Sequence, residues 1–342
     1  MRKSIVFIGF SIFFVLFALN TAFAQRGTAR ADVINIRLAS PLPRNSDWGR
    51  SLDRLAAEWE RVTDGSVRVI ISHDGREGTE MMMLSSLASN SNQVAIFTSA
   101  GMAEICPAVM NLSIPFVIRN EAELDLVLAD VLPLLESRVR SDFVVLAWSK
   151  SGWIYLFTKE PVHTPEELRR QRLATSPDLK DMNTVFRNMG FNLVEMDWVN
   201  IGTRLANNTV NAIYVIPAIV APMQLHRTGL NHMLNVPIAP VIGAMVINRV
   251  TWDRITAAHQ QEILRVTRRL IADFDVSMAR AEATAISAMG RDGLSVNRLT
   301  PAQDEMWRSE LEHSIPTLIG PIFDREIYHR INVLLERARN AR

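Results

Sequence analysis

The sequence predicts an α/β protein with two lobes, and three observations support this fold class. The first third of the chain alternates strand-like and helix-like segments, as parallel-sheet lobes do. The chain has 342 residues, which exceeds the roughly 100–200 residues of one typical domain. A helical pattern runs from Thr251 to about Met289 without proline, which suggests a long strut that crosses both lobes.

The alternation begins with a strand and a helix. Ile34, Ile36 and Leu38 alternate with polar residues, as in a half-buried strand. Ser46 can cap the helix that follows, and Gly65 can end it. The apolar residues that share one face of this helix are Trp48, Leu52, Leu55, Trp59 and Val62.

The pattern then continues as strand, helix and strand. Residues 67–71 are β-rich, and the helix after them carries Met81, Leu84 and Leu87. Residues 94–98 form a short apolar run bounded by polar residues, as expected of a buried parallel strand. This order of segments implies right-handed crossovers in the first lobe.

The middle of the chain predicts a helix and two separate strands. Residues 121–138 have a helical pattern that contains Pro133. The β-rich runs 143–148 and 153–158 are separated by Lys150-Ser151-Gly152, so we expect one strand on each side. Further strands are expected at residues 192–196, 210–215 and 244–248.

Three later helices have start or stop signals. Thr164 can cap a helix with Pro165 at its first position and acidic residues in its first turn. Asn200 can cap a short helix that contains Leu205. A last helical region begins at Thr300 and is interrupted by Pro316, Gly320 and Pro321.

These elements suggest a division of the chain in which several crossings join the lobes. We expect lobe 1 to contain residues 33–152 and 240–258. We expect lobe 2 to contain residues 153–239 and 290–342. The long inter-lobe helix is expected at residues 251–289.

Residues 1–24 have the order of a secretory signal peptide. Arg2-Lys3 is a basic start, Ile5 to Leu19 is apolar, and Ala22-Phe23-Ala24 matches an A-x-A cleavage site. Gln25 follows where a lipoprotein needs cysteine. We therefore expect a cleaved, soluble, periplasmic protein that is not a lipoprotein. An uncleaved signal anchor is the alternative.

Charge and motifs exclude several function classes. The 37 Lys and Arg nearly balance the 36 Asp and Glu, which argues against nucleic acid as a partner. Hydrophobic residues make up 48% of the chain, so it is not disordered. The single cysteine, Cys106, excludes a disulfide scaffold. Without a nucleophile elbow, an H-E-x-x-H motif or a phosphate loop, we expect no enzyme, no metal and no cofactor.

Five short motifs occur in the order found in one family of exported receptors. They are Leu38-Ala39-Ser40-Pro41 with Trp48-Gly49, Thr63 to Val69, Leu112-Ser113-Ile114-Pro115-Phe116, Thr164-Pro165-Glu166-Glu167-Leu168, and Trp252-Asp253. With them the chain resembles the DctP-type solute receptors of TRAP (tripartite ATP-independent periplasmic) transporters. The resemblance covers nearly the whole mature chain.

The resemblance implies a two-lobe periplasmic binding protein fold with a ligand cleft between the lobes. Such receptors capture a small-molecule ligand, usually an organic acid, and deliver it to TRAP membrane permease subunits. Some lie beside exported helical-repeat proteins. An interaction module for a helical-repeat partner is therefore a further alternative.

Two positions depart from the family pattern. In the usual pattern, an arginine that pairs with the ligand carboxylate follows the T-P-x-D-L helix, and Ala174 stands there in this sequence. The usual D-G-x-x-N-P segment offers an asparagine, and Ile216 stands in its place. Arg172 could replace the arginine only in a shifted register.

We therefore predict an apolar cleft for an apolar or amphipathic ligand, because a carboxylate buried without a cation is costly. The alternative is an organic acid held by Arg172 or Arg204. Individual tryptophans and methionines could equally be ordinary core. The candidate ligand-binding residues are Trp48, Ser99, Trp153, Ala174, Ser176, Trp198, Tyr214, Ile216 and Met223.

Overall fold

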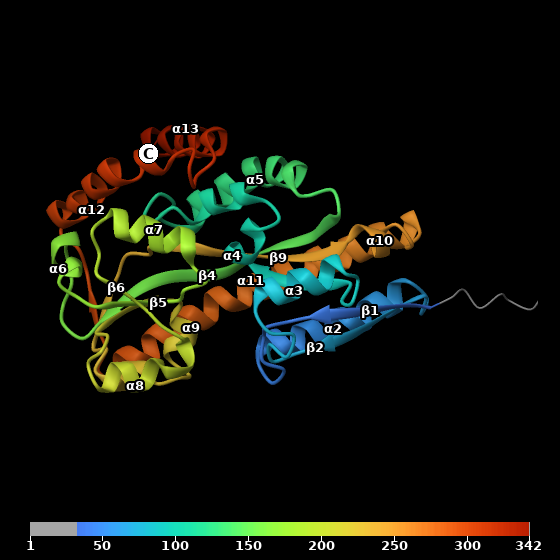
Figure 1. Cartoon of the computed structure of the whole chain (residues 1–342), viewed down its shortest axis with the longest axis horizontal. Helices are drawn as coiled ribbons and strands as arrows, with labels where there is room; N and C mark the ends of the chain where they lie inside the picture. Colours follow the sequence, from blue (N-terminus) through green and yellow to red (C-terminus); the bar gives the residue numbers. More distant parts are fainter. Residues whose placement is uncertain (1–32, 342) are drawn as a thin grey trace, which may run out of the picture.

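The structure of the protein, a computed structural model, describes residues 33–341 (Figure 1). The expected signal peptide, residues 1–24, and its cleavage site lie outside the described residues. Within residues 33–341, no helix combines the length and the apolar character that a membrane crossing requires.

The described strands form one connected sheet, in the order β2-β1-β3-β9-β4-β7-β5-β6. Strand β8 lies beside β4, and β10 lies beside β8. The strands are β1 (Ile34–Ala39), β2 (Val67–Ser72), β3 (Val94–Thr98), β4 (Phe143–Thr158), β5 (Leu173–Thr175), β6 (Leu193–Glu195), β7 (Ala212–Val215), β8 (His232–Leu234), β9 (Ala239–Asn248) and β10 (Ser295–Asn297).

Helices cover this sheet and join its strands (Figure 1). The α-helices are α2 (Asp47–Val62), α3 (Glu80–Ala88), α4 (Ser99–Ala103), α5 (Glu121–Arg138), α6 (Pro165–Arg169), α7 (Lys180–Asn188), α8 (Ile201–Ala206), α9 (Pro217–Val220), α10 (Arg249–Trp252), α11 (Ala257–Arg291), α12 (Pro301–Ser314) and α13 (Arg325–Asn340). Short 3-10 turns are η1 (Pro107–Ser113), η2 (Trp198–Asn200), η3 (Leu225–Thr228) and η4 (Pro316–Leu318).

The predicted opening alternation is confirmed. The Ser46 side chain accepts a hydrogen bond from the Gly49 amide and caps α2, and α3 lies between β2 and β3. Strand β1 pairs in parallel with both β2 and β3. Strand β3 is also antiparallel to β9, so the expected parallel surroundings of residues 94–98 hold on one side only.

The prediction of two separate strands at 143–148 and 153–158 is wrong. One strand, β4, spans both runs and shifts register between Lys150 and Trp153. Gly152 has a φ of +108°, a conformation that L side chains rarely adopt. The irregularity therefore absorbs the extra residues as a bulge, and the chain stays in the sheet.

The long helix starts later than predicted. The pattern from Thr251 divides into α10, whose N-cap is Asn248, and α11, whose N-cap is Thr256. Each cap side chain accepts a backbone hydrogen bond, and these two starts interrupt the helix between Asp253 and Thr256. The side chain of Asn200 makes no capping bond to α8, contrary to the prediction.

Two helices tie distant parts of the chain together. Helix α11 contacts α2, β4 and α9, so it runs along both halves of the sheet, as expected of a strut (Figure 1). Helix α13 buries Ile327, Ile331 and Leu335 in one core cluster with Val127 and Val131 of α5. The expected division groups α13 with lobe 2, whereas these contacts join it to the side of α5.

Candidate functional site

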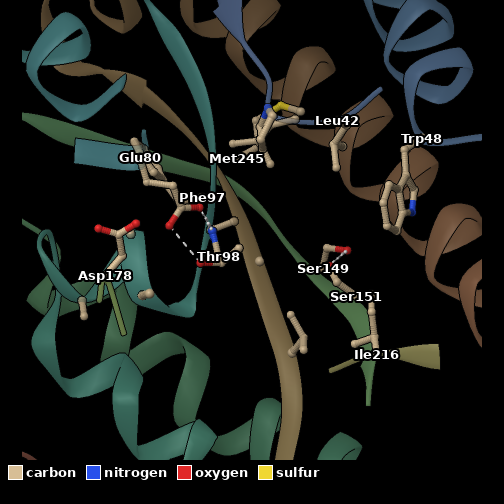
Figure 2. Close-up of a pocket in the computed structure, with 18 of the residues that line it drawn as sticks. Leu42, Trp48, Glu80, Phe97, Thr98, Ser149, Ser151, Asp178, Ile216 and Met245 are labelled. Carbon is tan, nitrogen blue, oxygen red and sulfur yellow. Dashed lines mark hydrogen bonds between the residues drawn. The ribbon is translucent and has the colours of Figure 1, made fainter. Parts of the chain in front are cut away.

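A cleft of about 880 Å³ opens between the two halves of the molecule. One wall comes from the first half and includes Leu42 and Trp48. The other wall comes from the second half and includes Trp198, Tyr214 and Ile216. Figure 2 shows Leu42, Trp48 and Ile216 facing the same space.

The floor of the cleft consists of the elements that both halves share. Ser149 and Ser151 of β4 and Met245 of β9 line it (Figure 2). Phe274 of α11 closes it beside Trp48, with the two ring centroids 6.2 Å apart. The site is therefore built on the shared sheet strands and the strut helix.

The lining is mostly apolar. Tyr214 supplies a polar group deep in the second half, but its hydroxyl already pairs with the Thr175 hydroxyl at 2.7 Å. Burial raises the pKa of Tyr214 to about 12, so the phenol stays neutral. Apolar and aromatic lining with a few polar groups is typical of a small-molecule pocket.

The charged residues of the cleft are predominantly acidic. Its acidic lining residues are Glu80, Glu104, Asp178 and Asp181. Among the cleft-lining residues of the described chain, Lys180 alone is basic. This balance disfavours an anionic ligand.

Glu80 is held in place by the end of β3. Its carboxylate accepts hydrogen bonds from the Thr98 amide at 2.6 Å and from the Thr98 hydroxyl at 2.9 Å (Figure 2). Burial raises the pKa of Glu80, the Thr98 bonds oppose that rise, and the charge of Asp178 adds to it. Two carboxylates from different halves thus share one end of the cleft.

The structure brings five of the nine predicted site residues to the cleft. These are Trp48, Ser176, Trp198, Tyr214 and Ile216. The Trp48 indole N–H points to the Met278 sulfur at 2.6 Å, which ties α2 to the strut helix. Ser176 lies at the end of β5, where its hydroxyl accepts from the Asp178 amide at 3.3 Å.

The other four predicted residues lie elsewhere. Ser99 is buried and donates to the Ile242 carbonyl at 2.9 Å. Trp153 is buried, and its indole N–H donates to Glu121 at 2.6 Å. Ala174 of β5 is buried in an apolar cluster, and Met223 is exposed and does not line the cleft.

The two arginines of the organic-acid alternative do not line the cleft. The Arg172 guanidinium donates to the carbonyls of Asn208 and Thr209, with its shortest bond at 2.6 Å. Arg204 is exposed on α8. In this structure neither side chain is placed to hold a ligand carboxylate.

Two further carboxylates, on α11, meet the irregular part of β4 beneath the cleft. Asp275 accepts from the Ser149 hydroxyl at 2.7 Å, and Glu282 accepts from the Trp153 amide at 2.8 Å. Burial raises the pKa of Asp275 to about 6 and also raises the pKa of Glu282. They anchor the strut helix to β4.

Sequence reasoning missed Glu80 and Asp178. A usable signal was present, because Thr98 ends a β-strand and ligand sites in α/β proteins gather at carboxyl ends of strands. The hydrogen bonds between Thr98 and Glu80 could not be predicted from the sequence, because the two residues are 18 positions apart.

The family follows from the sequence as a whole. Residues 38–318 match the DctP model, described as bacterial extracellular solute-binding protein, family 7. The chain belongs to this family. A solute-binding protein of Verminephrobacter eiseniae is 23% identical over 244 residues, covering 69% of this chain and 70% of that protein.

Solved structures of solute-binding proteins share the fold. A TRAP periplasmic solute-binding protein from Ralstonia eutropha, with bound (S)-2-acetolactate, has a TM-score of 0.79 and 17% identity over 89% of this chain and 99% of its own. One from Ochrobactrum anthropi, with its C-terminus bound in the ligand pocket, has a TM-score of 0.82 and 18% identity over 91% and 98%. The galactonate-bound DctPAm of Advenella mimigardefordensis has a TM-score of 0.76 and 16% identity over 90% and 99%.

Membership of the DctP family confirms the expected class. The protein is a TRAP-type solute-binding receptor and not an enzyme. TRAP solute-binding proteins are periplasmic, bind small molecules and interact with membrane permease components. The expected helical-repeat partner receives no support from these comparisons and stays a prediction.

Proposed function

We propose that this DctP-family receptor captures an apolar or amphipathic small molecule in its cleft and delivers it to a TRAP permease. The observation that carries the proposal is the lining itself, which is mostly apolar and whose charges are mainly acidic. Apolar area removed from water supplies about 25 cal/mol per Å², so a cleft of this kind favours apolar surface on its ligand.

The alternative ligand is an organic acid. It is supported by the acids that two structurally similar proteins bind. (S)-2-acetolactate and galactonate are bound by the Ralstonia and Advenella proteins. In this chain, however, Arg172 is occupied by backbone carbonyls and Lys180 lies exposed at the cleft. A carboxylate in the interior would therefore be desolvated without a buried cation, which is costly.

Ligand identification is the direct test. The mature chain from Gln25 is purified, extracted with organic solvent, and the released molecules are identified by mass spectrometry. A lipid or other apolar molecule at near-stoichiometric amount supports the proposal. A small organic acid at that amount contradicts it.

Ile216→Asn places an amide where the family pattern has asparagine. We expect about tenfold weaker binding of an apolar ligand, because the variant loses apolar contact area and must desolvate an amide. Binding is measured by calorimetry with the extracted ligand. The control is Ile70→Asn, which changes an exposed isoleucine of β2 outside the cleft. Unchanged affinity in the Ile216 variant would contradict an apolar contact there.

Arg172→Gln separates the two ligand classes. We expect the substitution to leave the affinity for dicarboxylates and sugar acids, whatever its value in the wild type, unchanged. The reason is that the Arg172 side chain is bound to the Asn208 and Thr209 carbonyls. Lys180→Gln is the matched comparison at the cleft. Loss of acid binding in Arg172→Gln, with the unfolding temperature unchanged, would restore the organic-acid alternative.

A further inference from the structure

The polar end of the cleft distinguishes between amphipathic ligands. Glu80 reaches the cleft from α3, and Asp178 reaches it from the loop between β5 and α7. Figure 2 shows both carboxylates at one end and Trp48 at the other. The cleft thus has an acidic end and an apolar end.

The Glu80 carboxylate is fixed before any ligand arrives. The Thr98 amide and hydroxyl each donate to one of its oxygens. Gly101 lies so close that a Cβ at this position would be 2.6 Å from Oε2 of Glu80. A carboxylate oriented in this way keeps lone pairs free to accept further hydrogen bonds.

Asp178 gives the same space a second negative charge from the opposite half. Glu104 and Asp181 add to this field, and Lys180 opposes it. A cation placed between Glu80 and Asp178 would relieve their mutual repulsion and form charge-assisted hydrogen bonds with both. Because the two carboxylates come from different halves, such a cation would also bridge the cleft.

We infer that the ligand carries a protonated amine that binds between Glu80 and Asp178, with its apolar body toward Leu42, Trp48 and Ile216. This inference rests on the proposed function, since it assigns the head group of the same amphipathic ligand. It excludes a carboxylate as the recognised group at this end.

A matched series of C8 probes tests the head group. Octylamine, octanol and octanoate are titrated into ligand-free mature protein by calorimetry at neutral pH. We expect octylamine to bind at least tenfold more tightly than octanol, and octanoate to bind most weakly. Equal binding of octylamine and octanol would overturn the head-group inference and leave the apolar cleft standing. Tightest binding of octanoate, or no binding of any probe, would overturn both.

Two variants locate the amine. Asp178→Asn and Glu80→Gln are each expected to weaken octylamine binding about tenfold and to leave octanol binding unchanged. Asp178 is exposed, so its variant keeps the test valid if Glu80→Gln folds poorly. Asp253→Asn, an exposed change outside the cleft, is the control. Unchanged octylamine affinity in Asp178→Asn would overturn the assignment.

Discussion

Replacing Trp59 by alanine is expected to lower the free energy of unfolding by about 4 kcal/mol, as truncation of a large buried aromatic residue does. Trp59 is fully buried between α2 and the strut helix α11. Its indole N–H donates to the Thr267 hydroxyl at 2.8 Å, and Thr267 is also fully buried. The variant loses apolar contacts and leaves that hydroxyl without its donor.

Urea unfolding of the mature protein measures this change. Trp59→Phe is the matched variant, because it keeps a buried aromatic ring while it removes the N–H donor together with part of the indole volume. Thr267→Val then removes the acceptor, so the pair separates packing from hydrogen bonding. A loss below about 1 kcal/mol for Trp59→Ala would show that α2 and α11 do not depend on this contact.

The double change Asp275→Asn with Glu282→Gln is expected to make the protein more stable above pH 6. Burial raises the folded-state pKa of both carboxyl groups, that of Asp275 from 3.8 to about 6. The folded protein therefore binds more protons than the unfolded chain between about pH 4 and 6, and its stability falls as pH rises through this window. Above pH 6 the full cost of ionisation is present.

For Asp275 this cost is on the order of 2 kcal/mol after allowance for its partial exposure. The groups that face it are the Ser149 hydroxyl, the Lys150 amide and ammonium, and the more distant Glu121. Glutamine and asparagine oxygens can still accept the same bonds. Thermal unfolding at pH 5 and pH 8 measures the gain of the variant over wild type. A gain that is larger at pH 5 would contradict the assigned sign.

Local signals made several elements predictable. Thr164 and Pro165 start α6, and the capping box formed by Thr164 and Glu167 is present. The helix at 121–138 has the predicted bounds. These features depend on residues within one turn of each other, so the sequence alone contains their cause.

Features that depend on distant contacts were not predictable. The Lys150-Ser151-Gly152 segment suggested a break, but β9 pairs with β4 on both sides of it and keeps the strand whole. Ala174 was expected at the cleft, but β5 buries it next to Ile213 of β7. The acidic pair was missed for the same reason, because Asp178 meets Glu80 only in the folded chain.

The shared strands constrain any rotation of one half of the sheet against the other. Since β4 and β9 belong to both halves of the sheet, a rotation of one half against the other must bend both strands and the strut helix together. Bending costs the least energy at the bulge around Gly152, where the regular pairing of β4 is already interrupted. A ligand in the cleft would then lie next to the bending point. The outer edges of the two halves, which are farthest from that point, would be displaced most. A permease that contacts those edges would therefore distinguish an occupied receptor from an empty one, because a small rotation at the ligand becomes a larger displacement at the edges.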